Sequence, residues 1–553
     1  MMMILAAAIA AVAGAGPYDV ILSNGRVVDG TGAPWYRADV GIRGDRIAAI
    51  GDLKDAQAKR RIDASKLVVA PGFIDMLGQS EFNVLVDNRA ASKITQGITT
   101  EITGEGHSIA PLTRKMIDAD AAIWAHYGVK PDWTTLDGYF RAFERRRVAI
   151  NLGTFVGAGG VREVVLGREE RAPNADELKK MESLVAAAME DGALGLSTSL
   201  LYVPSNYATT EEIVALAKVA RRYGGSYITH QRNEGEGIHE SVDEVLRIAR
   251  EADIPAEIYH LKTAGPKAWG MMPAVLKRLE DARTQGLDVV ADVYPWTASS
   301  NSLHATLPYW ARAGSREEMV ARLRDPAARA KVRDELAQDS AWALENGPAR
   351  ILIADTLDPS LARYEGKNLD EIAKAEGKHP ADALMDIVVA DKGNTSKITF
   401  SMNEDDVRAA VKHPLVSFCT DSDASATDGI FSKERNHPRA WGSMPRILGR
   451  YVREEKLLSL EEAIRKMTSL PATRMRLVDR GQVRPGFFAD LVAFDPETIV
   501  DRSTYVNPWQ YSAGIPYVMV NGQLVVDDGT ITEARPGRIL RGPGHRAARP
   551  AIR

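Results

Sequence analysis

The fold is decided by a stretch in the middle of the chain, where short apolar runs alternate with longer amphipathic ones: VAINLGTFVG (148–157), ADELKKMESLVAAAME (175–190), GALGLSTSL (192–200), EEIVALAKVARRYG (211–224) and GSYITH (225–230). The short runs have the length of strands, and the long ones place apolar residues three or four apart, as helices do. The same order continues through SVDEVLRIAREA (241–252), AEIYHLK (256–262), MPAVLKRLEDARTQG (272–286) and LDVVADVYP (287–295). Strand–helix alternation predicts a parallel sheet with right-handed crossovers.

This alternation extends over residues 71–477, with polar residues at the strand ends. Such a length favours a closed (β/α)8 TIM-type barrel. The alternative is an open doubly wound sheet, which normally carries a Gly-rich phosphate turn after its first strand, and the sequence has none. At about 302–349 the pattern changes to charged helical sequence, SREEMVARLRDPAARAKVRDELAQ. We interpret this segment as an insertion over the barrel mouth, with a pair of solvated outer helices as the alternative.

Both ends of the chain are rich in strand-like runs. Residues 17–70 contain YDVILSNGRVVDG and ADVGIRGDRIAAIG, and residues 478–545 contain GFFADLVAFDP and YVMVNGQLVVDDG. Asn-Gly, Asp-Gly and Gly-Asp turns separate these runs, as in hairpins. The ends are predicted to pair into one small β-sandwich domain. Two separate β appendages are less favoured because each would expose its sheet edges.

Composition limits the function further. The chain has 553 residues, of which 45% are hydrophobic and 26% charged, and a net charge of -4. This length predicts more than one folding unit, and the lack of basic excess argues against binding to nucleic acid. Cys419 is the single cysteine, so an intrachain disulfide is excluded and clustered metal ligands must be mostly His, Asp and Glu.

The chain begins with MMMILAAAIAAVAGAG (1–16), an apolar run that ends in small residues. It is shorter than the roughly 20 residues of a membrane-spanning helix, and no other stretch is long and apolar enough. It is typical of a secretory signal peptide cut near Ala13 or Ala15, which predicts a periplasmic or secreted protein. No Lys or Arg precedes the run. A misplaced start, or a loose tail on a cytoplasmic protein, is therefore the alternative.

Reactive residues of a parallel barrel lie at the carboxyl ends of its strands. SYITH ends in His230, and AEIYH ends in His260 with Lys262 just beyond. Two histidines on consecutive strands face the same barrel mouth, and a carboxylate from another strand would complete an N,N,O set suited to zinc. An unliganded aspartate could then deprotonate a water molecule. Taken singly, each histidine is more often a packing or surface residue. Further strand-end candidates are Glu101, Glu105, Asp292, Tyr294 and Asp421.

From residue 18 onward the chain resembles the N-acyl-D-amino-acid deacylases (D-aminoacylases) of the metal-dependent amidohydrolase superfamily. The motifs that carry the resemblance keep the family's order and spacing: APGFID (70–75), GITTEITGEG (97–106), GLSTSLLYVPSNYATTEE (195–212), THQRNE (229–234), HLK (260–262), DVYPWTASS (292–300), HPRAWGSMPRILGRYVREE (437–455), KMTSLPA (466–472) and RGQVRPGFFADLVAFDP (480–496). The resemblance implies a barrel joined to a small β-sandwich built from both termini.

The resemblance also implies roles for single residues. His230 and His260 match the family's histidines for the more buried metal, and Asp421 matches its general base. The guanidinium of Arg439 can pair both oxygens of a carboxylate at once. A structural salt bridge is the alternative role for Arg439. The positions that match the family's contacts to substrate and its carboxylate are Tyr294, Ser300, Arg439, Lys262 and, more loosely, Tyr202.

Two positions depart from the family. Its His-x-His pair on the first strand is replaced by Leu77 and Gln79, and a frequent cysteine ligand by Glu105. A carboxylate at that place with the histidine pair missing is similar to the mono-zinc N-acetylglucosamine-6-phosphate deacetylases. We therefore expect one zinc per chain, or another divalent metal, bound by Glu105, His230 and His260.

The resemblance implies hydrolysis of the amide bond of an N-acyl amino acid, especially one of D configuration, with Asp421 as general base. The expected partner is a small molecule with a free carboxylate, and association into a homo-oligomer is expected by analogy. A dipeptidase or cyclic-amide hydrolase on the same scaffold is the alternative enzyme. A binding protein with a degenerate metal site is the non-catalytic alternative.

Overall fold

The computed structural model describes residues 17–338 and 347–545. The predicted signal segment, residues 1–16, lies outside the described residues, as does part of the predicted insertion, residues 339–346. Among the described residues, no helix combines the length and the apolar character needed to cross a bilayer.

Parallel strands form the centre of the molecule. One ladder runs β6-β7-β8 and a second runs β9-β10-β11-β12-β13-β17. β8 and β9 flank Phe155, and a parallel bridge between Gly78 and Ser422 brings the end of β17 back to β6, so the described strands follow a closed ring. They are the (β/α)8 TIM-type barrel predicted from the sequence. The strand bounds are β6 (Phe73–Asp75), β7 (Ile98–Thr103), β8 (Asn151–Thr154), β9 (Val156–Gly157), β10 (Gly195–Ser199), β11 (Ser226–His230), β12 (Ala256–Ile258), β13 (Val289–Val293) and β17 (Val416–Phe418).

Helices with clear end signals follow these strands around the outside. Asn174 forms a capping box with Glu177 at the start of α7, and Gly192 ends this helix in a left-handed conformation. The helices between and after the barrel strands are α1 (Asn83–Val86), α2 (Ala91–Ile94), α3 (Arg114–Ala119), α4 (Ala121–His126), α5 (Leu136–Arg146), α6 (Ala158–Leu166), α7 (Ala175–Asp191), α8 (Thr210–Arg222), α9 (Ile238–Glu251), α10 (Met272–Thr284), α16 (Glu404–Lys412), α17 (Arg439–Arg446), α18 (Leu460–Met467) and α19 (Ser469–Arg474).

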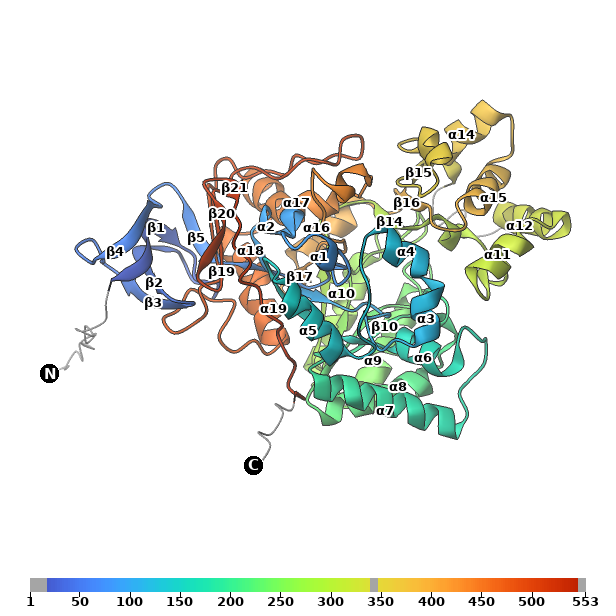
Figure 1. Ribbon diagram of the computed structural model, residues 1–553, viewed down its shortest axis with the longest axis horizontal. Coiled ribbons are helices and arrows are strands. Elements are labelled where there is room, and N and C mark those ends of the chain that lie inside the picture. The colour runs from blue at the N-terminus through green and yellow to red at the C-terminus, as the bar shows by residue number, and fades with distance from the viewer. Residues whose placement is uncertain (1–16, 339–346, 546–553) are drawn as a thin grey trace.

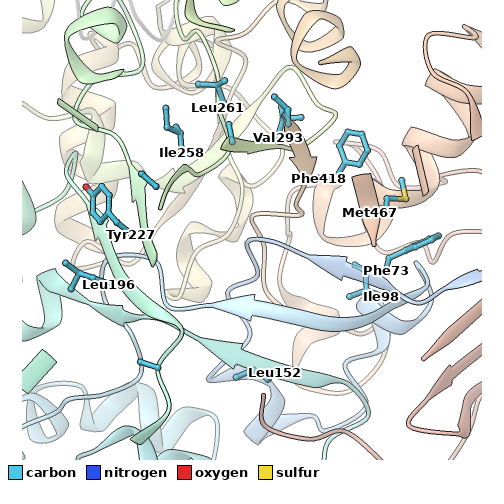
Figure 2. Packing of buried hydrophobic residues seen from close by; sticks show 14 of the residues in the cluster. Phe73, Ile98, Leu152, Leu196, Tyr227, Ile258, Leu261, Val293, Phe418 and Met467 are labelled. Carbon is cyan, nitrogen blue, oxygen red and sulfur yellow. The ribbon is translucent and has the colours of Figure 1, made fainter. Parts of the chain in front are cut away.

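Strand alternation divides the core into two layers. On β11, Tyr227 packs outward with the helices, whereas its neighbour Ile228 packs inside the barrel with Ile102 and Phe155. Figure 2 shows the outward layer, in which Leu196, Tyr227 and Ile258 come from successive strands. Because the barrel interior is filled with side chains, polar residues can gather only where the strands end.

The two chain ends meet in one nine-stranded sheet. Its order is β21-β20-β19-β18-β5-β1-β2-β3, with β4 paired to β1, so β5 lies between an N-terminal and a C-terminal strand. Arg60 on β4 and Asp527 on β20 form a two-bond ion pair with distances of 2.6 and 2.7 Å. The strand bounds are β1 (Tyr18–Val27), β2 (Tyr36–Arg43), β3 (Arg46–Gly51), β4 (Ala58–Asp63), β5 (Val68–Pro71), β18 (Leu491–Phe494), β19 (Tyr517–Val520), β20 (Gln523–Asp527) and β21 (Thr530–Ile531).

A separate unit follows β13 and has a hydrophobic cluster of its own. Its antiparallel sheet has the order β14-β16-β15, so the unit runs from Ser299 to Thr399 and is longer than the charged segment, 302–349, from which an insertion was predicted. In Figure 1 it lies at the end of the molecule opposite the terminal sheet. Its elements are β14 (Ser299–Ser302), α11 (Arg316–Arg322), α12 (Pro326–Gln338), β15 (Ile351–Ile353), α14 (Leu369–Glu376), α15 (Pro380–Ala390) and β16 (Ser396–Thr399).

Candidate metal centre and active site

Three of the residues singled out in the sequence form one cluster. Oε1 of Glu105 lies 2.9 Å from Nδ1 of His230 and 3.2 Å from Nε2 of His260. One ligand atom from each residue lies within 4.8 Å of the others, and among the described residues this is the group of His, Cys, Asp and Glu that could hold a metal ion. The donor set is N,N,O, which suits zinc.

Strand ends position these ligands. Glu105 follows β7, His230 is the last residue of β11, and His260 lies two residues beyond β12. His260 has a φ of 35°, a left-handed conformation that is costly for a residue with a side chain. Its backbone N–H donates to Oδ1 of Asp292 at 2.7 Å, and Asp292 comes from the next strand, β13. The neighbouring strand therefore stabilises the backbone that aims the His260 ring.

The charged groups in this cluster shift one another's pKa values. Burial would raise the pKa of Glu105, but hydrogen bonds and charge from His230 and His260 outweigh it and hold the pKa well below the usual range. Burial and the charge of Lys262 would lower the pKa of His260, yet nearby carboxylates raise it to about 10. A metal ion competes with protons for such a site, because it needs neutral imidazole and ionised carboxylate.

The outward atoms of the histidine rings meet a residue that the sequence reasoning missed. Oε1 of Glu234 lies 3.2 Å from Nδ1 of His260, and its Oε2 lies 3.8 Å from Nε2 of His230. Lys262 donates to Glu234 at 2.6 Å and lies 2.6 Å from Nδ1 of His260. These two contacts place the ammonium of Lys262 beside the His260 ring, and its role in substrate binding stays a prediction. A carboxylate behind a metal-binding histidine is a common supporting arrangement.

Glu105 is also held on its other oxygen. The side-chain amide of Gln79 donates to Oε2 of Glu105 at 2.5 Å, which leaves Oε1 facing the histidines. Leu77, the other residue in the place of the family's histidine pair, is fully buried among apolar side chains. Glu101, a second candidate from the same turn, is 3.2 Å from the buried ammonium of Lys93 and accepts from Ser80, so its contacts lie apart from the histidines.

Asp421 lies three residues beyond β17 and shares the left-handed conformation of His260, with a φ of 48°. Its Oδ2 accepts from Arg439 at 2.6 Å in a buried ion pair. The negative charge of Asp421 is among the causes that raise the pKa of His260. This ion pair between Arg439 and Asp421 is a salt bridge of the kind that the sequence analysis gave as the alternative role of Arg439.

The remaining candidates surround this pair. The guanidinium of Arg439 lies 4.8 Å from the ring centre of Tyr294 and donates to the backbone oxygen of Ser300 at 3.2 Å. Nε of Arg439 and the hydroxyl of Tyr294 are buried without a hydrogen-bond partner among the described residues. The ring of Tyr202 packs 5.1 Å from that of His230, and its hydroxyl accepts from Asn301 of the inserted unit at 3.2 Å. The structure thus brings all nine predicted residues to one end of the barrel.

Comparison with known proteins identifies relatives that match this chain over nearly its whole length. The sequence profile of the amidohydrolase family matches residues 60–526. A D-aminoacylase of Alcaligenes xylosoxydans xylosoxydans is 36% identical over 529 residues, which cover 95% of this chain and 98% of that protein.

Two solved structures are similar over 95% of this chain and 100% of their own. One is a D-aminoacylase studied for its binuclear metal centre, with one-metal activation and second-metal attenuation; it is 35% identical with a TM-score of 0.80. The other is an N-acyl-D-glutamate deacylase from Bordetella bronchiseptica complexed with zinc and a phosphonate that mimics the tetrahedral intermediate of the reaction; it is 34% identical with a TM-score of 0.80. From its barrel, its cluster of donors and these relatives, we conclude that the chain belongs to the amidohydrolase family.

Proposed function

We propose that the chain hydrolyses the amide bond of N-acyl amino acids, with N-acyl-D-amino acids as the preferred class. One observation carries this proposal: Glu105, His230 and His260 converge from three strand ends within 4.8 Å, in a chain 36% identical to a D-aminoacylase. The products would be a carboxylate and a free amino acid.

Glu105, His230 and His260 would hold one zinc ion, with another divalent metal as the alternative occupant. Supporting this assignment, the imidazole and carboxylate donors face one another, and Glu234 and Gln79 support them from behind. Bound there, zinc would polarise the amide carbonyl and lower the pKa of a water molecule.

Asp421 is the residue that we propose as general base. Its carboxylate would take a proton from the attacking water and later deliver it to the nitrogen of the leaving amine. The ion pair with Arg439 supports this role, because it fixes one of the two carboxylate oxygens in place. The other oxygen remains available to the water.

Tyr294, Ser300 and Arg439 would bind the substrate carboxylate. The support is the pair of buried polar atoms without partners, Nε of Arg439 and the hydroxyl of Tyr294. Burying a donor without a partner costs free energy, and a substrate carboxylate would supply the missing acceptor. Tyr202 lies beside His230 and would line the side-chain pocket.

The larger architecture supports related proposals. The apolar cluster shared by β1, β2, β18 and β19 supports a sandwich-like packing of the terminal sheet over residues 17–70 and 478–545. The contact between Asn301 and Tyr202 supports a position of the inserted unit over the mouth of the barrel, residues 71–477. Export to the periplasm or medium and assembly into a homo-oligomer remain predictions.

The deciding experiment combines elemental analysis with paired assays on N-acetyl-D- and N-acetyl-L-amino acids. One zinc per chain with turnover of the D series would support the proposal. Turnover of only the L series would overturn the stereochemical part. A metal-replete protein that hydrolyses neither series would refute the substrate class, and a protein that binds no metal under any loading condition would refute the metal site.

A further inference from the structure

The turn that carries Asp421 is strained and needs support. Asp421 has a φ of 48°, in the left-handed region that residues with side chains rarely adopt. Its backbone N–H donates to the carbonyl of Leu77 at 2.8 Å. Such a conformation persists only where the surroundings hold it from several sides. The residues before and after Asp421, Thr420 and Ser422, are therefore the places to look for support.

Lys93 on α2 reaches both of these residues. Its ammonium donates to Oγ1 of Thr420 at 2.7 Å, to the carbonyl of Ser422 at 2.7 Å and to Oδ2 of Asp75 at 2.9 Å. Oε1 of Glu101 lies 3.2 Å from the same ammonium, so four acceptors share its three N–H donors. Lys93 and Asp75 are both fully buried. A fully buried lysine is rare unless its charge is paired, which marks this position as specialised.

Asp75 completes the clamp from the first barrel strand. Its Oδ1 accepts the backbone N–H of Thr420 at 2.8 Å, and its Oδ2 accepts the hydroxyl of Thr420. Lys93 and Asp75 together hold the turn at its entrance and its exit. The side chain of Asp421 itself points to Arg439 and makes no hydrogen bond to Lys93.

We propose that Lys93 is a positioning residue for Asp421. Lys93 holds the strained turn so that the carboxylate of Asp421 faces the metal ligands. Its effect on catalysis rests on the proposed role of Asp421 as general base. The effect on the turn itself does not depend on that role.

The chain offers a matched control in Lys466 on α18. It is also fully buried, and its ammonium donates to the backbone carbonyls of Val411 and His413, at 2.8 Å for the latter. Those carbonyls precede β17, whereas Thr420 and Ser422 follow it. The two lysines thus hold opposite ends of the same strand, and only one end carries Asp421.

The test compares Lys93→Met and Lys466→Met, each with its metal content, Tm, kcat and KM measured on the metal-loaded protein. Both substitutions should lower the Tm, because each leaves buried acceptors without their partner. Only Lys93→Met should lower kcat, by about 10- to 100-fold, since a shift of about 1 Å in a reacting group has effects of this size. KM and metal content should stay close to the native values. Equal loss of kcat in both variants would reduce Lys93 to a structural role and overturn the proposal.

A double variant isolates the route of the effect. If Lys93 acts through Asp421, adding Lys93→Met to Asp421→Asn should cause no further loss of kcat, because residues that act as a unit are not additive. An additive loss would overturn the proposal. Lys93→Arg keeps the positive charge, so it provides a folded protein should the methionine variant fail to fold. Its planar fork cannot reach the same three acceptors, and the same comparison applies to it.

A crystal structure of the Lys93 variant separates this proposal from the proposed function. A relaxed φ at Asp421 would support the positioning role even in a protein that hydrolyses no N-acyl amino acid. An unchanged turn would overturn it, whatever the activity of the native chain.

Discussion

Replacing Glu234 with glutamine tests how the metal ligands are held. Metal binding through Nε2 of a neutral His260 ring leaves the proton on Nδ1, and Glu234, 3.2 Å from Nδ1, is the carboxylate in place to accept it. Glu234 also neutralises Lys262, whose ammonium lies 2.6 Å from that same nitrogen. The Glu234→Gln variant keeps the shape of the side chain but removes its charge. The cation of Lys262 would then oppose both the Nδ1 proton and the metal.

The expected effect follows from these two contacts. Loss of a partner behind a metal-binding histidine weakens metal affinity by about 10- to 100-fold. This corresponds to about 1.4–2.8 kcal/mol. The lower value applies if the amide oxygen still accepts from Nδ1, and the uncompensated charge of Lys262 favours the upper value. Burial makes screening by solvent weak, because the Glu234 side chain is only 12% exposed.

The assay is a competition for zinc against a chelator of known affinity, with Kd compared between variants. Glu244→Gln is the matched control, because Glu244 is similarly buried, at 13% exposure, and pairs with Arg232 rather than with a metal ligand. Its Kd should stay within threefold of the native value. A Kd for Glu234→Gln within that same range would refute the idea that Glu234 orients His260.

Other predictions concern the base, the missing ligands and a buried acid. Asp421→Asn should lower kcat by about 100- to 10,000-fold without loss of metal, because an amide cannot accept the proton of water; unchanged turnover would exclude Asp421 as the base. Leu77→His combined with Gln79→His should raise the metal content from one to two per chain by elemental analysis, and a content of one would mean that the family's outer position cannot form here. Burial raises the pKa of Glu81 from 4.5 to about 7, against hydrogen bonds that lower it. Below pH 4.5 both states hold the proton; as the pH rises toward 7 the unfolded chain releases it first, so folding loses stability until the folded group also ionises. Denaturant unfolding of the native protein, relative to Glu81→Gln, should thus show a loss of about 3 kcal/mol between pH 4 and pH 8, and parallel curves would contradict the shift.

Much of this arrangement could be predicted because the chemistry follows local rules. Short apolar runs such as SYITH can be recognised as strands, so their last residues can be identified. Barrel geometry then places His230 and His260 at one mouth. Their convergence with Glu105 within 4.8 Å confirms that the three lie together. Their roles as ligands, and that of Asp421 as base, remain predictions.

The supporting residues could not be predicted in the same way. Glu234 lies in a loop after β11, and no periodic pattern indicates that this loop returns to His260. Lys93 and Thr420 are 327 positions apart, so only the closed barrel brings them together. The inserted unit also continues past residue 349. The sequence could not show this, because α14 and α15 have the same apolar spacing as barrel helices.

The sheet shared by the two chain ends has a consequence for biosynthesis. β18 begins at Leu491, roughly 420 residues after β5 ends at Pro71, and it pairs directly with β5. At about 5–20 residues per second, the ribosome needs on the order of tens of seconds to supply that partner. During this time the nascent chain carries an unpaired strand edge, the kind of surface that invites aggregation. Newly made protein should therefore depend on chaperones more than the finished fold does, and slowing of translation should increase that dependence.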